Sequence, residues 1–189
     1  MKTKNYILTA LFTLLTLGLS AQQNNVNAEA STINWLGKKI LGQHDGAVKL
    51  KSGSLLIDNN QITGGEFTID MQSITCNDIE DAEYNGKLVG HLKSDDFFGV
   101  ANHPTATLKI TKATAFENSK ATVTGEFTIK GKTQTISFEV SKEKESYLAK
   151  IEIDRSKHDI KYGSTSFFDS LGDKAIDDIF TLDVKLVLN

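Results

Sequence analysis

The sequence predicts an all-β fold with one or two short helices, an antiparallel barrel of about eight strands with a helix across one end. Three observations predict this fold. Apolar and polar residues alternate from residue 31 onward, each alternating run is bounded by Gly, Asn or Asp, and the apolar residues of each run share one face. One dry face per strand suits a sheet that closes around an apolar interior, and closure also removes exposed strand edges.

Eight runs carry the strand pattern. The expected strands are 32–36, 47–57, 61–71, 105–111, 122–130, 133–140, 147–154 and 180–188. The second strand is expected to bend at Ser52 and Gly53. The segment Gly-Glu-Phe-Thr-Ile occurs at both 65–69 and 125–129, by chance or by internal duplication. In each copy the glycine shares the inward face with the following phenylalanine, where it permits sharp curvature or leaves room inside.

Two helical interruptions are expected. In the first, 81–94, Tyr84, Leu88 and Leu92 recur at four-residue spacing and form one apolar stripe. The second is a turn or short helix near 166–172. A barrel of this size with a helix over one opening can hold one small ligand, but the helix can equally plug a filled core. Periodicity alone does not distinguish these two arrangements.

The chain is expected to be exported and to contain one folded domain. Residues 1–21 combine Lys2 and Lys4, an apolar stretch and a small-residue cleavage zone, as in a secretory signal peptide. Residues 22–30 read as a polar linker and 31–189 as the barrel domain. No cysteine lies near the junction to carry a lipid anchor, and the apolar stretch is too short to span a bilayer comfortably. We therefore expect a secreted, periplasmic protein without stable membrane insertion. The sequence leaves open whether it forms a homodimer.

The charge excludes one class of partner. Residues 1–21 hold two of the 21 basic residues and none of the 24 acidic ones, so the remainder carries a net charge of −5. A mildly acidic chain with one arginine, Arg155, is poorly suited to nucleic acid, because phosphate and base contacts favour arginine.

Catalytic and metal-binding motifs are not apparent in the sequence. The histidines His44, His91, His103 and His158 follow no metal-ligand spacing, so neither a metal site nor a cofactor is predicted. Cys76 is expected to be an inert thiol, because a nucleophile needs a positioned base. We therefore predict a non-catalytic protein.

Arg155 and two pairs of phenylalanines are the candidates for a functional barrel end. Arg155 continues the inward phase of Ile151 and Ile153, so its charge needs either an acid such as Asp154, Asp169 or Asp173, or an anionic ligand head group. The adjacent pairs 97–98 and 167–168 lie in turns, where we expect them to cover one barrel mouth.

The chain resembles the YceI-like family of secreted lipid- and polyisoprenoid-binding proteins. The resemblance is carried by Ser31–Trp35, Gly64–Ile74, the run from His91 to Pro104, Gly125–Val140, and Asp154–Ser156 leading to Tyr162–Ser164. It implies a lipocalin-like barrel with a long apolar tunnel and no catalysis. Residues 37–46 are shorter than the opening hairpin of many members, and Lys157, His158 and Asp159 depart from the family pattern after Arg155.

We therefore expect binding or transport of a long-chain amphiphile, such as a polyisoprenoid, an isoprenoid quinone or a fatty-acid-like lipid. The alternative is a packed barrel that binds a protein or polysaccharide on its outer face. Candidate head-group ligands are His91 and Arg155. The candidate tunnel residues are Trp35, Phe67, Ile69, Leu88, Leu92, Phe97, Phe98, Leu108, Ile110, Phe127, Ile129, Ile136, Phe138, Phe168, Phe180 and Leu182.

Overall fold

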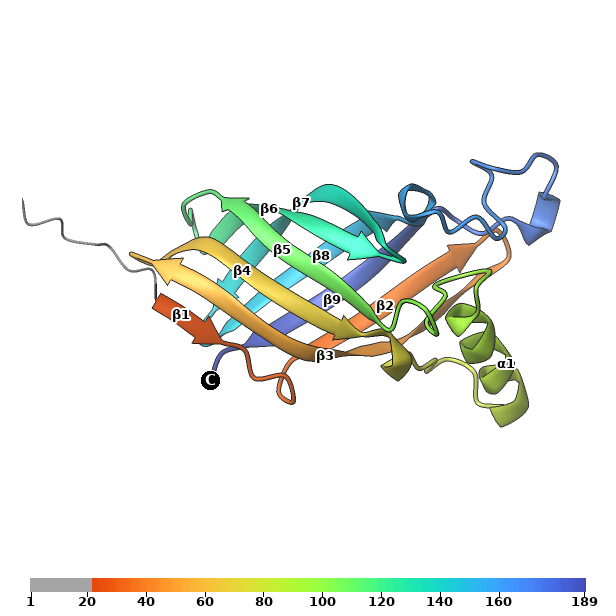
Figure 1. Ribbon diagram of the computed structural model, residues 1–189, viewed down its shortest axis with the longest axis horizontal. Coiled ribbons are helices and arrows are strands. Elements are labelled where there is room, and N and C mark those ends of the chain that lie inside the picture. Colours follow the sequence, from red (N-terminus) through yellow and green to blue (C-terminus); the bar gives the residue numbers. More distant parts are fainter. Residues whose placement is uncertain (1–21) are drawn as a thin grey trace, which may run out of the picture.

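A computed structural model describes residues 22–189, and the expected signal peptide lies outside these residues. One continuous antiparallel sheet forms the body of the protein (Figure 1). Its strands are β1 (Gln22–Asn25), β2 (Thr32–Lys39), β3 (Gly42–Asp58), β4 (Gln61–Asp70), β5 (Thr105–Ala113), β6 (Lys120–Ile129), β7 (Lys132–Glu143), β8 (Ser146–Asp154) and β9 (Ile179–Val187). The helices are α1 (Ala82–Lys93) and the short 3₁₀ turns η1 (Met71–Ser73), η2 (Arg155–His158) and η3 (Gly172–Lys174).

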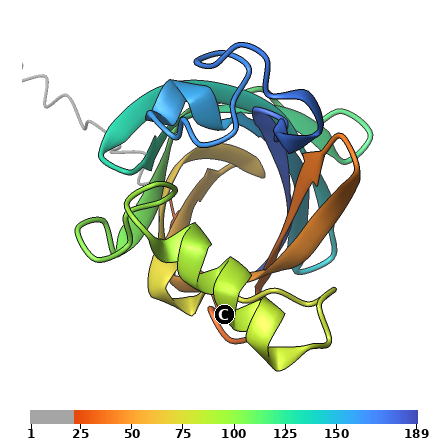
Figure 2. The same ribbon diagram turned by 90° about the vertical axis from the view of Figure 1, so that its right-hand side faces the viewer.

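Strand β3 closes the sheet into a barrel. One edge of β3 pairs with β2 along its first half and with β1 along its second half, while the other edge pairs with β4. The sheet continues from β4 through β5, β6, β7, β8 and β9 back to β2. Viewed along the barrel, the strands form a ring (Figure 2). The register of β3 against β4 shifts between Leu50 and Ser52, which marks a β-bulge next to the bend predicted at Ser52 and Gly53.

The eight predicted strands and the barrel are confirmed, and the polar linker is a correction. Within 22–30, β1 pairs with residues 54–57 of β3, and Val26 is buried in the core. This polar strand pairs through its backbone, which its Gln and Asn side chains do not reveal. Val26 and its pairing with Leu188 fasten the segment to the barrel.

The repeated glycines allow neighbouring strands to approach closely. A Cβ on Gly65 would lie 2.9 Å from the carbonyl oxygen of Ser54, and one on Gly125 would lie 2.8 Å from that of Lys109. Both glycines pair with Ile110 of β5, which lies between them. Any larger residue would force these three strands apart.

Helix α1 lies at one end of the barrel, along part of its rim (Figures 1 and 2). Asp81 begins it by accepting hydrogen bonds from the backbone N–H groups of Glu83 and Tyr84. Leu92 is buried and Leu88 is partly buried against the core, but Tyr84 is 65% exposed, so only part of the predicted stripe packs. The 166–172 segment consists of turns leading into η3.

Within the described part of the chain, no helix has the length and apolar character needed to cross a bilayer.

Candidate functional site

The barrel interior contains a first apolar cavity of about 60 Å³. Tyr147 is the only lining residue with a polar side-chain group, and no residue of α1 contributes. The lining residues come from strands β2 to β9 and are Ile33, Leu50, Leu55, Ile62, Phe67, Ile69, Leu108, Ile110, Phe127, Ile136, Phe138, Val140, Tyr147, Ala149, Ile151, Leu182, Val184 and Leu186. Such a surface is suited to a hydrocarbon chain.

A second cavity of about 90 Å³ lies toward α1. Ile69, Phe127 and Leu182 line both cavities, so the two are neighbours within one barrel interior. The other lining residues of the second cavity are Trp35, Gly37, Val48, Met71, Ile74, Leu92, Phe97, Phe98, Ala106, Ile129, Arg155, Ile176, Asp177 and Phe180. Arg155 and Asp177 are the only charged members, which gives the paired cavities one apolar end and one end with charged groups.

The structure brings nearly all the predicted tunnel residues to these cavities. The exceptions are Leu88, which packs against the core without reaching either cavity, and Phe168, which is 49% exposed. Contact of the other fourteen with a ligand stays a prediction. Sequence reasoning did not name Ile33, Leu50, Leu55 and Ile62, although the same alternation of apolar residues marks them.

The two phenylalanine pairs differ in placement. Phe97 is buried, its ring centroid lies 5.1 Å from that of Phe98, and Phe98 lies 6.3 Å from Phe180 across the second cavity's wall. Phe167 and Phe168 are 42% and 49% exposed and line neither interior cavity, so a covering role for this second pair stays a prediction.

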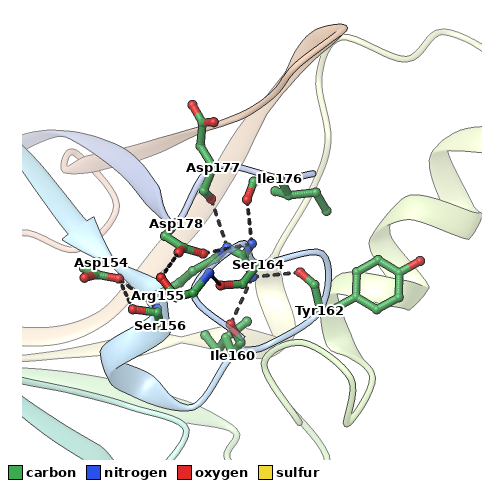
Figure 3. Close-up of polar contacts among 10 residues, drawn as sticks. Asp154, Arg155, Ser156, Ile160, Tyr162, Ser164, Ile176, Asp177 and Asp178 are labelled. Atoms are coloured by element: carbon green, nitrogen blue, oxygen red, sulfur yellow. Dashed lines mark hydrogen bonds and ion pairs between the residues drawn. The ribbon is translucent and has the colours of Figure 1, made fainter. Parts of the chain in front are cut away.

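Arg155 is almost fully buried, and the protein itself satisfies its guanidinium (Figure 3). Its Nε donates to the Asp177 carbonyl at 3.0 Å, and its Nη2 donates to the Ile176 carbonyl at 2.8 Å. Its Nη1 donates to the carbonyls of Ile160 and Tyr162 at 3.0 and 2.9 Å. These bonds tie the segment 160–178 to the start of η2.

The carboxylate that pairs with Arg155 is Asp178, with 3.3 Å between Nη2 and Oδ1. This corrects the three acids proposed from the sequence; Asp154 instead caps η2 by accepting from the Ser156 N–H. Burial lowers the pKa of Arg155, against the opposing effect of Asp178. Burial also tends to raise the pKa of Asp178, but hydrogen bonds from Ser164 and Ser166 and the Arg155 charge outweigh it and lower that pKa.

The two histidines near this end have different surroundings. The His91 ring is edge-on to Tyr162, with centroids 4.3 Å apart, and it also contacts Phe97 at 5.9 Å. His91 thus lies beside the second cavity rather than on its lining. His158, from the segment that departs from the family pattern, is buried, and its Nδ1 lies 2.9 Å from the Lys132 carbonyl.

Comparisons with known proteins agree with the barrel. The YceI-like domain family matches residues 25–188. A search of curated proteins found no match. Among solved structures, BcnA of Burkholderia cenocepacia is 23% identical with a TM-score of 0.69, over 87% of this chain and 99% of that one.

Two further solved structures share the fold. A polyisoprenoid binding domain from Saccharophagus degradans, implicated in plant cell wall breakdown, is 15% identical with a TM-score of 0.63, over 89% of this chain and 98% of that one. A YCEI protein of Campylobacter jejuni is 20% identical with a TM-score of 0.53, over 99% of both chains. At these identities the likeness concerns the fold.

Proposed function

Since the chain belongs to the YceI-like domain family, we propose that it binds a long-chain amphiphile, with the apolar tail inside the barrel and no catalytic step. The observation that carries the proposal is the pair of neighbouring apolar cavities along the barrel interior. The polyisoprenoid binding of the Saccharophagus degradans domain supports polyisoprenoids as the ligand class. Isoprenoid quinones and fatty-acid-like lipids belong to the same proposal because they also carry a long apolar tail.

The energetics favour an occupied interior. At about 24 cal/mol per Å³, unfilled cavities of about 60 and 90 Å³ each cost the fold on the order of 1 to 2 kcal/mol. Each methylene transferred from water into such a space contributes about 0.8 kcal/mol. A tail therefore relieves the cost of the cavities and gains its own desolvation. A barrel packed throughout, with a partner only on its outer face, would gain neither.

The distribution of charge supports one orientation of the ligand. The first cavity has no charged lining residue, whereas Arg155 and Asp177 line the second. A tail placed toward the first cavity leaves the polar head near α1, close to His91 and Arg155. Because protein groups already occupy the nitrogens of Arg155, its influence on a head group is that of a nearby charge.

The compartment belongs to the same proposal. A protein that carries a water-insoluble chain is useful where lipid must cross an aqueous space. The signal-like residues 1–21 favour export, and we place the protein in the periplasm. Fractionation of the producing cells tests this placement; recovery with cytoplasmic proteins would contradict it.

The first experiment is native mass spectrometry of the protein purified from its own envelope fraction. We expect a stoichiometric hydrophobic adduct, and denaturing extraction then identifies the lipid. A mass without adduct that persists after incubation with isoprenoid quinones and fatty acids would overturn the proposal. It would favour the packed barrel with an external partner.

A matched pair of variants on β5 locates the tail. Ala106 is buried on the second cavity's lining, whereas its neighbour Thr107 is exposed on the outer face. Ala106→Leu places an isobutyl group in the cavity, so we expect at least about tenfold weaker binding of the identified lipid. Thr107→Leu is the control and should bind normally. Equal binding by both variants would place the tail elsewhere.

A further inference from the structure

A histidine, a cysteine and an aspartate meet beside the first part of β3, at the edge that β4 does not cover. The segment after η1 runs along this strand: the N–H of Thr75 donates to the Ala47 carbonyl at 3.0 Å, and that of Asn77 to the Asp45 carbonyl at 2.8 Å. Side chains two residues apart on an extended chain share a face. Cys76 and Asp78 therefore point together, and His44 of β3 lies next to them.

The three side chains lie within coordination distance of one another. His44 Nδ1 is 2.8 Å from Asp78 Oδ2, and Cys76 Sγ is 3.2 Å from Asp78 Oδ1. One nitrogen, one sulfur and one oxygen atom all fall within 4.8 Å of each other. Among residues 22–189, this is the only group of three or more such side chains close enough to share an ion.

We propose that His44, Cys76 and Asp78 bind one thiophilic divalent cation, with zinc as the expected ion and water at the remaining position. Imidazole nitrogen, thiolate sulfur and carboxylate oxygen are the three ligand types that zinc takes in proteins. The proposal goes beyond amphiphile binding and does not depend on it, because none of the three residues lines either cavity.

The three ligand atoms reach a tetrahedral arrangement after side-chain movements of about 1 Å. Bonds of about 2.0 to 2.3 Å at tetrahedral angles separate neighbouring ligand atoms by about 3.3 to 3.6 Å. The separations of 2.8 Å from Asp78 Oδ2 and 3.2 Å from Asp78 Oδ1 need to widen by a few tenths of an ångström. The longest separation among the three ligand atoms, up to 4.8 Å, needs to close by up to about 1.2 Å. Binding replaces the thiol proton of Cys76, which is released to solvent as the sulfur–metal bond forms.

The surroundings hold the ligands in place while leaving access from solvent. The Asp45 N–H donates to Asp78 Oδ1 at 3.0 Å, and Asn85 Nδ2 donates to the Cys76 carbonyl at 3.0 Å. Such outer contacts orient metal ligands before the ion arrives. The His44 and Asp78 side chains are 32% and 29% exposed, whereas Cys76 is buried, so an ion approaches from the histidine and aspartate side.

The test uses the purified protein, stripped with a chelator and kept in a non-thiol reductant. We expect calorimetry to give one Zn²⁺ per chain, and Co²⁺ to produce a thiolate-to-metal charge-transfer band in the near ultraviolet. Cys76→Ser should abolish that band. His44→Gln and Asp78→Asn should each weaken Zn²⁺ binding by at least about tenfold, since even outer contacts of a metal site have effects of this size.

The control is His103→Gln, which removes a histidine outside the cluster and should leave Zn²⁺ affinity unchanged. His44→Gln also guards against misfolding as an explanation, because His44 is partly exposed and its loss should preserve the circular dichroism spectrum. Absence of the charge-transfer band in the unaltered protein, or Zn²⁺ binding that survives all three substitutions, would overturn the proposal. Neither outcome bears on lipid binding, which native mass spectrometry reports separately.

Discussion

Gly46 of β3 lies directly opposite Trp35 of β2, and the pair has no room for another carbon atom. A Cβ on Gly46 would stand 2.7 Å from two atoms of the indole ring and would overlap the carbonyl oxygen of Thr75. The indole Nε1 donates to that same carbonyl at 3.0 Å. Because Trp35 lines the second cavity, this contact links the cavity wall to the segment that carries Cys76 and Asp78.

Gly46→Ala should therefore destabilise the protein. The Thr75 carbonyl belongs to the backbone and cannot rotate away, so we expect the free energy of unfolding to fall by about 1 to 3 kcal/mol in urea titrations. Gly86→Ala is the control: the site in α1 is open, and alanine should raise the same free energy by about 0.5 to 1 kcal/mol. Similar changes in both variants would contradict the assigned role of Gly46.

Removing the buried charge of Arg155 should have a larger effect. Arg155→Met leaves the partly buried carboxylate of Asp178 without its cation, and we expect a loss of about 3 to 5 kcal/mol in the free energy of unfolding. Lys109→Met removes a cation from the exposed pair with Glu66 and should cost less than about 1 kcal/mol. A loss below 1 kcal/mol for Arg155→Met would show that the network does not stabilise the 160–178 segment.

Stability should fall in mild acid because of His158. Burial lowers the pKa of its imidazole from the ordinary 6.5, so the unfolded chain binds a proton that the folded chain resists. The contribution of the neutral His158 side chain to the free energy of unfolding is complete above pH 6.5. It is lost as the pH falls toward the pKa of His158 in the folded protein. Denaturant titrations from pH 7.5 downward should show the free energy of unfolding falling with pH in the unaltered protein. The slope of this free energy against pH should be shallower in His158→Gln. Identical slopes would exclude His158 as its source.

His91 should affect the choice of head group without affecting the tail. If its imidazole contacts an acidic head, His91→Ala should reduce the preference for fatty acids over fatty alcohols of equal length by about tenfold. Fluorescent-lipid displacement measures both affinities. Lys87→Ala, an exposed change on the same helix, should keep the preference. An unchanged preference in His91→Ala would remove His91 from the head-group site.

The sequence predicts most of the barrel because alternation of apolar residues reports burial directly. It places Phe67, Phe127 and Leu182 inside, and all three line the cavities. It does not reveal β1, whose polar side chains conceal backbone pairing. It identifies Arg155 as inward but not Asp178 as its partner, because that choice depends on how the long 160–178 segment folds back.

The pairing of β2 with β9 has a consequence for the order of folding. Only two neighbouring pairs in the described sheet, β1 with β3 and β2 with β9, join strands that do not follow one another along the chain. The β2–β9 ladder matches Ile33 with Val184, and contacts between such distant residues form slowly because a long loop must close first. Until β2 and β9 pair, the residues that will line the barrel interior lie on the open concave face of a curved sheet, in contact with water.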